Sequence, residues 1–500
     1  MRCISVVLSQ VLLLLVSFVG YAPSTAGAEE FSKLIPYPYY ASQDGGQNKV
    51  MYIDDGIAAL AMRVNMIRRA KQSIVAEYFI YNTDTAGRIF SKELAAAAKR
   101  GVKVRLLIDK SGPVFEFDEF FAKEMLSRGV EVRYYNAARL WRVSSLQFRT
   151  HRKLLAIDDQ EAITGGRNIG DDYFDLSPHF NFDDADLHAS GPIAKVMREA
   201  FDRFFADKIT ERPSLPVEPW IFDPLGTYKI GTAKAREFFN ATKEEVDARM
   251  RMNVAGARYL RAKEQHVCAT TTFSTDAPGA NFLKRLTPGF VDRYRFLRKT
   301  LFDKINAVDK RIIISSPYMI DGDNTNQTMD LLLKHGAKID LYTNSLASTD
   351  ATYVAANMYL GLQDWKKRGI NVFLHDGQWI PKNPQTPAFI RQAKSGTHSK
   401  VQVYMTKAYS EVMVGTYNVD HRSNYYNAEM ALFCKGNDQL TAEVVASIAN
   451  NTRYGLKVAS DGTHVTDRNG KVQSVYGATP GAVRKMKLIT IPSWLARDLL

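Results

Sequence analysis

The alternation of apolar and polar positions predicts an α/β fold in the first half of the chain. Apolar residues recur at helical spacing in four segments, and two short apolar runs between them are typical of buried strands. We expect helices at 57–70, 86–100, 117–128 and 193–205, strands at 73–80 and 102–108, and a hairpin formed by 154–157 and 161–164. Strands that alternate with helices indicate a sheet covered on both faces.

The same order of elements returns in the second half. The pattern predicts helices at 294–308, 327–335 and 351–367, strands at 311–315, 338–342 and 372–374, and a hairpin formed by 401–404 and 411–414. Sequence identity between the halves is low, so the repeat is one of order and motif. The chain is therefore predicted to hold two pseudo-symmetric α/β domains, each with a central sheet flanked by helices.

Segments outside the two halves set the expected domain limits. We expect domains at 29–211 and 266–454, the second beginning with a strand at 267–273, and a linker at 212–265 that contains a long charged helix at 232–263. Residues 455–481 are polar and glycine-rich, which favours a loop within the tail at 455–500. The last stretch, 485–500, combines basic residues with Leu488 and Trp494. It is either a segment that contacts a membrane surface or a terminal helix packed on its own domain.

The N-terminal segment is typical of a targeting sequence. Arg2 precedes a mostly apolar run over 4–20, and Ala26-Gly27-Ala28 offers small residues for cleavage. We expect residues 1–28 to be a secretory signal peptide, which implies export. The alternative is an N-terminal anchor formed by residues 4–20, a length near the lower limit for spanning a bilayer.

Net charge limits the kinds of partner, and the cysteines bear on the compartment and on metal binding. The formal net charge is +13, which is compatible with an anionic partner or with a generally basic surface. Removal of residues 1–28 leaves Cys268 and Cys434, which can pair in an oxidising compartment. Cys434 ends an apolar run, and we expect it to be a buried thiol. The sequence contains no zinc-binding pattern, so no metal is expected.

One motif with chemical meaning occurs once in each half. His151-Arg-Lys153 precedes Asn168, and His398-Ser-Lys400 precedes Asn418. In an extended chain, side chains two residues apart share a face, so each imidazole and ammonium point into the same cleft. One imidazole can attack phosphorus and a second can protonate the leaving alcohol, while the lysines and asparagines hold the phosphoryl oxygens. We therefore predict one phosphodiester-cleaving site built from both halves.

These residues resemble the HxKxxxxD signature of the phospholipase D superfamily. His151, Lys153 and Asp158 match it in the first half, but Met405 stands where the second copy should have its aspartate. A residue seven positions along a strand lies too far from the histidine to touch the same phosphate. We therefore expect Asp158 to be a turn or supporting residue and Met405 to be tolerated.

Longer blocks are similar to bacterial cardiolipin synthases, especially the C-type branch. The matching segments are 182–192, 343–350 and 422–430. The resemblance implies a phosphohistidine intermediate without a metal or cofactor, in a cleft between two pseudo-symmetric domains. It also implies acidic residues that orient the histidines: Asp184 for His151 and Glu429 for His398. We assign His151 as nucleophile and His398 as acid and base, an order that the sequence alone leaves open.

The function expected from this resemblance is that of a phosphatidyltransferase or hydrolase acting on phospholipids, most like a cardiolipin synthase. A phospholipid such as phosphatidylglycerol and a membrane surface are the expected partners. The expected location is the periplasmic side of a bacterial inner membrane, or outside the cell. The alternatives are a secreted phospholipase D without synthase activity, an endonuclease of the same superfamily, and a non-catalytic anion-binding protein. Nucleic acid is not expected, because aromatic residues do not interleave with a basic stripe.

Overall fold

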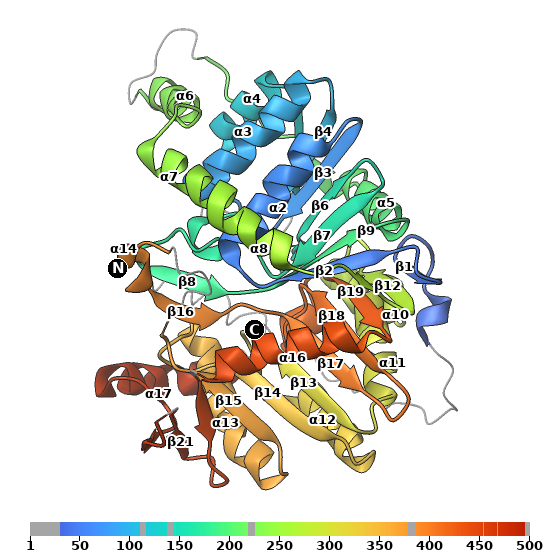
Figure 1. Cartoon of the computed structure of the whole chain (residues 1–500), viewed down its shortest axis with the longest axis vertical. Helices are drawn as coiled ribbons and strands as arrows, with labels where there is room; N and C mark the ends of the chain where they lie inside the picture. Colours follow the sequence, from blue (N-terminus) through green and yellow to red (C-terminus); the bar gives the residue numbers. More distant parts are fainter. Residues whose placement is uncertain are drawn as a thin grey trace.

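The computed structural model describes residues 31–110, 117–137, 145, 147–218, 226–378, 386–453, 455–467 and 469–495. It contains two α/β halves, one above the other in Figure 1, with the α6–α8 region on the upper half and α17 on the lower. The predicted signal peptide lies outside the described residues. No helix in the described part of the chain is long and apolar enough to cross a membrane.

The first half is built on a nine-stranded sheet of order β10-β5-β4-β3-β6-β7-β9-β2-β11. Its strands are β2 (Lys49–Ile53), β3 (Ser73–Tyr78), β4 (Lys103–Asp109), β5 (Val130–Tyr135), β6 (Leu154–Ile157), β7 (Glu161–Gly165), β9 (Asp186–Ser190), β10 (Thr210–Glu211) and β11 (His266–Val267). Strands β3, β4 and β5 pair in parallel through crossover helices, and β6 and β7 form the predicted hairpin. The helices are α2 (Gly56–Arg69), α3 (Thr85–Lys99), α4 (Glu119–Ser127) and α5 (Ile193–Phe205), as the periodicity predicted.

The second half is built on an eleven-stranded sheet of order β1-β12-β19-β18-β17-β13-β14-β15-β20-β21-β22. Its strands are β1 (Tyr40–Asp44), β12 (Thr270–Thr275), β13 (Arg311–Ser315), β14 (Lys338–Asn344), β15 (Asn371–His375), β17 (Val401–Met405), β18 (Ser410–Gly415), β19 (Met430–Lys435), β20 (Leu456–Val458), β21 (His464–Thr466) and β22 (Val472–Ser474). Its helices include α9 (Phe282–Arg285), α10 (Phe290–Tyr294), α11 (Phe296–Asn306), α12 (Asp323–Lys334), α13 (Thr352–Lys367), α14 (Ala388–Arg391), α15 (His421–Tyr425), α16 (Asp438–Arg453) and α17 (Pro480–Leu495). The repeated α/β order is confirmed.

A shared apolar core joins the two halves. Helix α5 contributes Phe201 and Phe204, helix α16 contributes Leu440 and Val444, and inward-facing residues of both sheets pack in the same cluster, among them Val412. These five side chains are completely buried. Because each half buries apolar surface against the other, the halves form one rigid frame for residues at their interface.

The halves also exchange strands. β1 precedes every strand of the first sheet in sequence, yet it pairs with β12 of the second. β11 follows the connecting segment and pairs with β2 of the first sheet. A separate two-stranded ribbon joins β8 (Phe180–Asp183) to β16 (Lys394–Thr397) in parallel. Backbone hydrogen bonds therefore cross between the halves at several places.

Two predictions about the connecting and terminal segments are wrong. The predicted long helix at 232–263 is interrupted between α6 (Thr227–Glu237) and α7 (Lys243–Arg251), and from α7 it continues through a π-helical segment at Met252–Gly256 into α8 (Ala257–Ala262). The expected loop at 455–481 contains β20, β21 and β22, which extend the second sheet. Strands of three residues are too short for an apolar alternation to be recognised in the sequence, although Leu456, Val458 and Val465 are buried.

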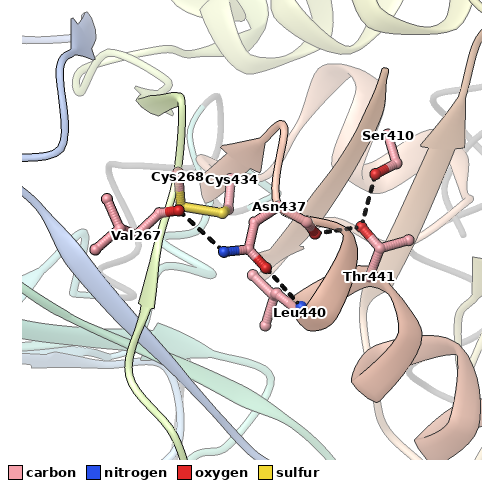
Figure 2. Close-up of a disulfide and its surroundings, with 7 residues drawn as sticks. All are labelled: Val267, Cys268, Ser410, Cys434, Asn437, Leu440 and Thr441. Carbon is pink, nitrogen blue, oxygen red and sulfur yellow. Dashed lines mark hydrogen bonds between the residues drawn. A yellow bond between two sulfur atoms is a disulfide. The ribbon is translucent and has the colours of Figure 1, made fainter. Parts of the chain in front are cut away.

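The expectation of a buried thiol at Cys434 is correct for burial but wrong for the thiol, because a disulfide joins Cys434 to Cys268 (Figure 2). Cys268 lies between β11 of the first sheet and β12 of the second. Beside it, the Asn437 side-chain amide donates a hydrogen bond to the Val267 carbonyl over 2.9 Å. The disulfide therefore fixes the segment where the chain crosses from one sheet to the other.

We expect loss of this disulfide to destabilise the protein by about 2–5 kcal/mol, because it closes a long loop in the unfolded chain. The variant is Cys268→Ala/Cys434→Ala, and thermal unfolding is the measurement. A reductant should lower the melting temperature of the parent toward that of the double variant and leave the double variant unchanged. Equal melting temperatures of parent and variant under oxidising conditions would contradict the expectation.

Candidate active site

His151 is held by a carboxylate from the other half of the protein. Its Nδ1 lies 3.0 Å from Glu429 Oε2 and 3.1 Å from the carbonyl oxygen of Thr416. Both neighbours are acceptors, so Nδ1 carries the proton and donates it. The lone pair is then on Nε2, which leaves that nitrogen as the nucleophile or base. The imidazole is buried, with 7% of the residue exposed.

His398 has the corresponding arrangement with the halves reversed. Its Nδ1 lies 2.7 Å from Asp184 Oδ2, and 5% of the residue is exposed. Gly166 permits this carboxylate to lie close to the end of β7, since a Cβ at that position would fall 2.1 Å from Asp184 Oδ1. Lys400 Nζ also lies 2.9 Å from this Nδ1. In the tautomer whose Nδ1 donates to Asp184, Nε2 carries the free electron pair and faces away from the carboxylate.

The predicted pairing of histidines with carboxylates is therefore wrong. We expected Asp184 to orient His151 and Glu429 to orient His398, but each carboxylate contacts the histidine of the opposite half. Backbone pairing between the halves is the physical reason. Thr397 pairs in parallel with Asp183, and Thr150 pairs in parallel with Ala428.

Parallel pairing brings the next residues of the two paired segments to the same level. The His398 amide donates to the Asp183 carbonyl over 2.8 Å, and the His151 amide donates to the Ala428 carbonyl over 2.9 Å. Thr397 precedes His398 and pairs with the residue before Asp184. In the same way, Thr150 precedes His151 and pairs with the residue before Glu429. Neither half can place both members of a pair alone, so the site exists only when the halves are assembled.

Three residues that support Glu429 were missed from the sequence. The Thr416 hydroxyl donates to Oε2 over 2.5 Å and the Ser423 hydroxyl to Oε1 over 2.7 Å. The Glu429 amide donates to Asp276 Oδ2 over 3.0 Å. Thr416 and Ser423 stand within the segments that carry the resemblance, but nothing in their spacing reveals that they bind a carboxylate.

Two residues at strand ends position the segments that precede the histidines. Asp109 ends β4 and accepts the amide of Thr150 over 2.8 Å. Asn344 ends β14 and accepts the amide of Thr397, also over 2.8 Å. These equivalent contacts in the two halves explain how each histidine is held at the end of its sheet. Asn344 belongs to the 343–350 segment of the sequence resemblance.

Lys153 and Lys400 are buried beside the histidines. Lys153 Nζ donates to the His151 carbonyl over 2.7 Å, and Lys400 Nζ donates to the His398 carbonyl over 2.6 Å. An ammonium group carries three protons, so each lysine keeps donors for an anionic ligand. Two buried cations within one site favour a ligand of high negative charge density, such as a phosphodiester.

Asn168 and Asn418 follow the hairpin strands β7 and β18. The side-chain oxygen of Asn168 accepts the Ile80 amide over 3.1 Å, which fixes the plane of the amide group. Its Nδ2 is buried without a hydrogen-bond partner of normal geometry among the described residues. A buried N–H group without an acceptor is unfavourable unless a ligand supplies one. The Asn168 side chain is therefore suited to donate to a phosphoryl oxygen.

The electrostatics show that the two motifs form one site. Burial lowers the pKa of His151 well below its usual value, and the charges of Lys153 and Lys400 lower it further. Burial also lowers the pKa of His398 well below its usual value, with Lys400, Lys153 and His151 adding to the effect. Each imidazole thus feels the ammonium group of the other half.

The pKa values of the charged neighbours are shifted as well. Burial lowers the pKa of Lys153 to about 7, with the Lys400 charge as a further cause, and burial lowers the pKa of Lys400 to about 8. Burial raises the pKa of Glu429 to about 7 and also raises the pKa of Asp184. A concentration of groups with perturbed pKa values is typical of functional sites.

Aromatic rings form the walls around both imidazoles. Phe79 meets His151 edge to face, with ring centroids 5.2 Å apart. Tyr173 and Phe182 pack on His398 at centroid distances of 5.2 and 4.9 Å. These contacts fix the ring planes and replace water around the imidazoles.

Asp158 lies outside this cluster, as its distance along the strand predicted. It occupies the β6–β7 turn at φ 51°. Its carboxylate accepts the amides of Lys71, Gln72 and Ser73 over 2.7, 2.8 and 2.8 Å. Asp158 therefore fastens the hairpin to the start of β3. Met405 ends β17 at the corresponding place, where its carbonyl accepts the Lys310 amide over 3.2 Å.

We expect Asp158→Ala to lower the free energy of unfolding by about 1–3 kcal/mol, because three backbone donors lose their shared acceptor. Activity per folded molecule should stay within about twofold of the parent, since the carboxylate does not touch the imidazoles. Denaturant unfolding and a turnover assay on the same preparation are the measurements. A loss of activity without a loss of stability would assign Asp158 a direct part in the chemistry.

Three of the other described histidines have carboxylate partners away from the imidazole pair. His188 contacts Glu161 at 2.9 Å, His266 contacts Glu443 at 2.8 Å and His464 contacts Asp461 at 2.9 Å. Among the described residues, no group of three or more histidine, cysteine or acidic side chains is arranged to hold a metal ion.

Comparisons with known proteins agree with this geometry. Residues 64–205 and 301–451 match a family model described as cardiolipin synthase, PLD-like domain. Cardiolipin synthase C of Escherichia coli (strain K12) is 27% identical over 416 residues, covering 78% of this chain and 82% of the relative. An uncharacterized protein of Helicobacter pylori (strain ATCC 700392 / 26695) is 27% identical over 417 residues, covering 79% and 78%.

A solved structure shares the fold. The crystal structure of phosphatidylserine synthase from Haemophilus influenzae Rd KW20 matches with a TM-score of 0.61 and 12% identity, covering 92% of this chain and 97% of that chain.

Proposed function

Because the chain belongs to the cardiolipin synthase family of phospholipase D-like proteins, we propose that it is a phosphatidyltransferase. The proposed reaction moves a phosphatidyl group from a phospholipid such as phosphatidylglycerol to the hydroxyl of a glycerol-bearing acceptor. Cardiolipin synthase C, at 27% identity, supports this choice of substrate class. The observation that carries the proposal is the crossed pair of imidazoles, each oriented by a carboxylate from the other half.

The first step is attack by His151. Its Nδ1 proton is held by Glu429, so the free electron pair of Nε2 forms a bond to phosphorus. The bond between phosphorus and the leaving alcohol oxygen breaks, and Nε2 of His398 gives that oxygen a proton. Burial lowers the pKa of His398 and so disfavours its protonated form. The negative charge of the bound substrate favours that form. The product is a phosphohistidine and a free alcohol.

The second step reverses the roles of the groups. His398, now neutral, removes a proton from the acceptor hydroxyl, whose oxygen attacks phosphorus. The bond to His151 Nε2 breaks, and its electron pair returns to the imidazole. Lys153 and Lys400 hold the phosphoryl oxygens through both steps, and Asn168 and Asn418 donate hydrogen bonds to them. These donors are fixed before substrate arrives, because the surrounding backbone holds them.

The nature of the acceptor distinguishes a synthase from a hydrolase. Purified protein with vesicles of phosphatidylglycerol should yield cardiolipin and glycerol in equal amounts. Release of phosphatidic acid as the sole lipid product would instead identify a hydrolase that uses water. Cleavage of plasmid DNA without any reaction on lipid would refute the lipid assignment. Addition of a chelator should leave the rate unchanged, because the proposed reaction uses side chains of the protein and no metal ion.

We also propose that the protein acts on the outer side of the cytoplasmic membrane or beyond it. The Cys268–Cys434 disulfide supports this location, because structural disulfides persist in oxidising compartments. The targeting segment at the N-terminus supports it as well. Fractionation of cells, with thiol labelling before and after reduction, is the test, and a reduced protein in the cytoplasm would contradict it.

We expect kcat/KM to have a bell-shaped dependence on pH. The lowered pKa of His151 keeps its imidazole neutral in mild acid, so the acid limb should lie below pH 6.5. On the alkaline side, deprotonation of His398, whose pKa is lowered by burial, should begin the decline, and loss of the ammonium charges at a pKa of about 7 for Lys153 and about 8 for Lys400 should continue it. Turnover of a phosphodiester across pH 4–10 is the measurement. A rate that still rises above pH 9 would contradict the role of the lysines.

A further inference from the structure

Helix α17 has one face packed on the protein and one face exposed. Met486 is 2% exposed and packs against Leu346 and Ala356, so the helix rests on the β14–α13 region. This confirms one of the two alternatives for the C-terminal segment, a helix packed on its own domain. The opposite face carries Leu488 and Ile491, which are 72% and 71% exposed. Packing on the domain therefore buries only one face of this helix.

The exposed face combines apolar and basic side chains. Trp494 is 48% exposed and lies two turns beyond Lys487. Arg484, Lys485 and Lys487 are all exposed, and the helix sequence contains no acidic residue. A helix with Leu, Ile and Trp beside several cations has the composition of a segment that lies in the interface of an anionic bilayer.

The place of α17 connects this face to the candidate active site. Leu346 follows Asn344 by two residues, and Asn344 accepts the amide of Thr397, next to His398. Ala356 lies on the first turns of α13, which packs along α17 at the lower left of Figure 1. A surface bound at the exposed face of α17 would thus lie on a helix that packs against the segment following Asn344.

We propose that α17 docks the protein on a bilayer of anionic phospholipid, with Leu488, Ile491 and Trp494 inserted at the interface. Arg484, Lys485 and Lys487 then contact the lipid phosphates. Charge complementarity selects this occupant, since a face with three cations and no acid suits an anionic surface. The inference rests on the proposed function only for the choice of lipid, and it is tested by binding without turnover.

Trp494 provides a direct probe in the full-length chain. Vesicles of phosphatidylglycerol with brominated acyl chains should quench its fluorescence, and the quenched component should be missing in Trp494→Phe. Trp365, which is completely buried, serves as the internal control and should not be quenched. Equal quenching of the parent and Trp494→Phe would overturn the proposal, because Trp494 would then not reach the acyl chains.

A matched pair of variants separates docking from general hydrophobicity. Leu488→Ser/Ile491→Ser should weaken binding to phosphatidylglycerol vesicles at least about tenfold, since two side chains lose burial in the bilayer. Ile230→Ser/Met250→Ser changes two apolar residues that are 64% and 59% exposed on α6 and α7, and should bind like the parent. High salt should weaken parent binding, and neutral phosphatidylcholine vesicles should bind less.

The proposal and the enzyme assignment fail in different ways. Leu488→Ser/Ile491→Ser should hydrolyse a water-soluble phosphodiester at the parent rate while failing to bind vesicles. Unchanged vesicle binding by this variant, or an equal loss in Ile230→Ser/Met250→Ser, would overturn the docking role. So would a concentration-dependent dimer of the parent that the variant abolishes, since a second copy would then cover the face. An inactive parent that still binds vesicles through α17 would refute only the enzyme assignment.

Discussion

Replacing either His151 or His398 with alanine is expected to lower kcat by about 10⁴-fold or more, because residues that act as one catalytic unit lose nearly all activity singly. Each imidazole is buried with its Nδ1 fixed by a carboxylate, so no other described histidine can take its place. The measurement is the turnover of phosphatidylglycerol by each variant. The double variant should be no slower than the single ones.

Folding has to be separated from chemistry in this experiment. His188→Ala is a suitable control, because His188 is a buried histidine of β9 paired with a carboxylate, Glu161 at the start of β7, and not with either site histidine. It should lose stability and keep its turnover per folded molecule. If His398→Ala retained a rate within tenfold of the parent, the two motifs would not form one catalytic unit.

Replacing either of the two carboxylates that orient the histidines is expected to have the second large effect on turnover. We expect Glu429→Gln and Asp184→Asn each to lower kcat by about 10²–10⁴-fold, because an amide cannot hold the imidazole in the same tautomer or stabilise its charge. The amide is nearly isosteric. Its oxygen can accept from one of the hydroxyls of Thr416 and Ser423, and its NH2 can donate to the other, because a hydroxyl group both donates and accepts. Stability should therefore change little, and KM for the phosphodiester should stay close to that of the parent.

Leaving-group dependence shows which histidine each carboxylate serves. A p-nitrophenyl ester needs no proton on its leaving group, so the burst of nitrophenol in its first turnover depends on His151 as nucleophile and little on His398 as acid. Glu429→Gln should slow both this burst and the reaction of a natural phospholipid, whereas Asp184→Asn should slow mainly the phospholipid. The reverse pattern would mean that each carboxylate serves the histidine of its own half or that His398 is the nucleophile.

Much of the fold and the site was predictable, because it depends on local patterns. Apolar periodicity located α2, α3, α5 and the hairpins that follow His151 and His398. The repeated His-x-Lys identified the groups that meet at the site. The distance of Asp158 from His151 along the strand predicted that it lies away from the imidazole, where it binds the amides of residues 71–73.

The features that escaped prediction depend on contacts between distant segments. The crossed pairing follows from the parallel bridges Thr397–Asp183 and Thr150–Ala428, which join residues more than two hundred positions apart in sequence. A repeat suggests self-contained halves, and that expectation produced the wrong partners for Asp184 and Glu429. Likewise, the apolar run before Cys434 indicated burial, but only the register of β19 with β12 shows that Cys268 lies beside it.

One phosphohistidine is expected to form in a site shared by both halves. Mass spectrometry of His398→Ala, quenched during the reaction with a phosphatidyl p-nitrophenyl ester, can detect it. The ester's leaving group needs no acid, while release of the intermediate needs a base. We predict a phosphatidyl group on His151 of this variant, and none on His151→Ala under the same conditions. A modification on any other residue, or none in His398→Ala despite release of nitrophenol, would contradict it.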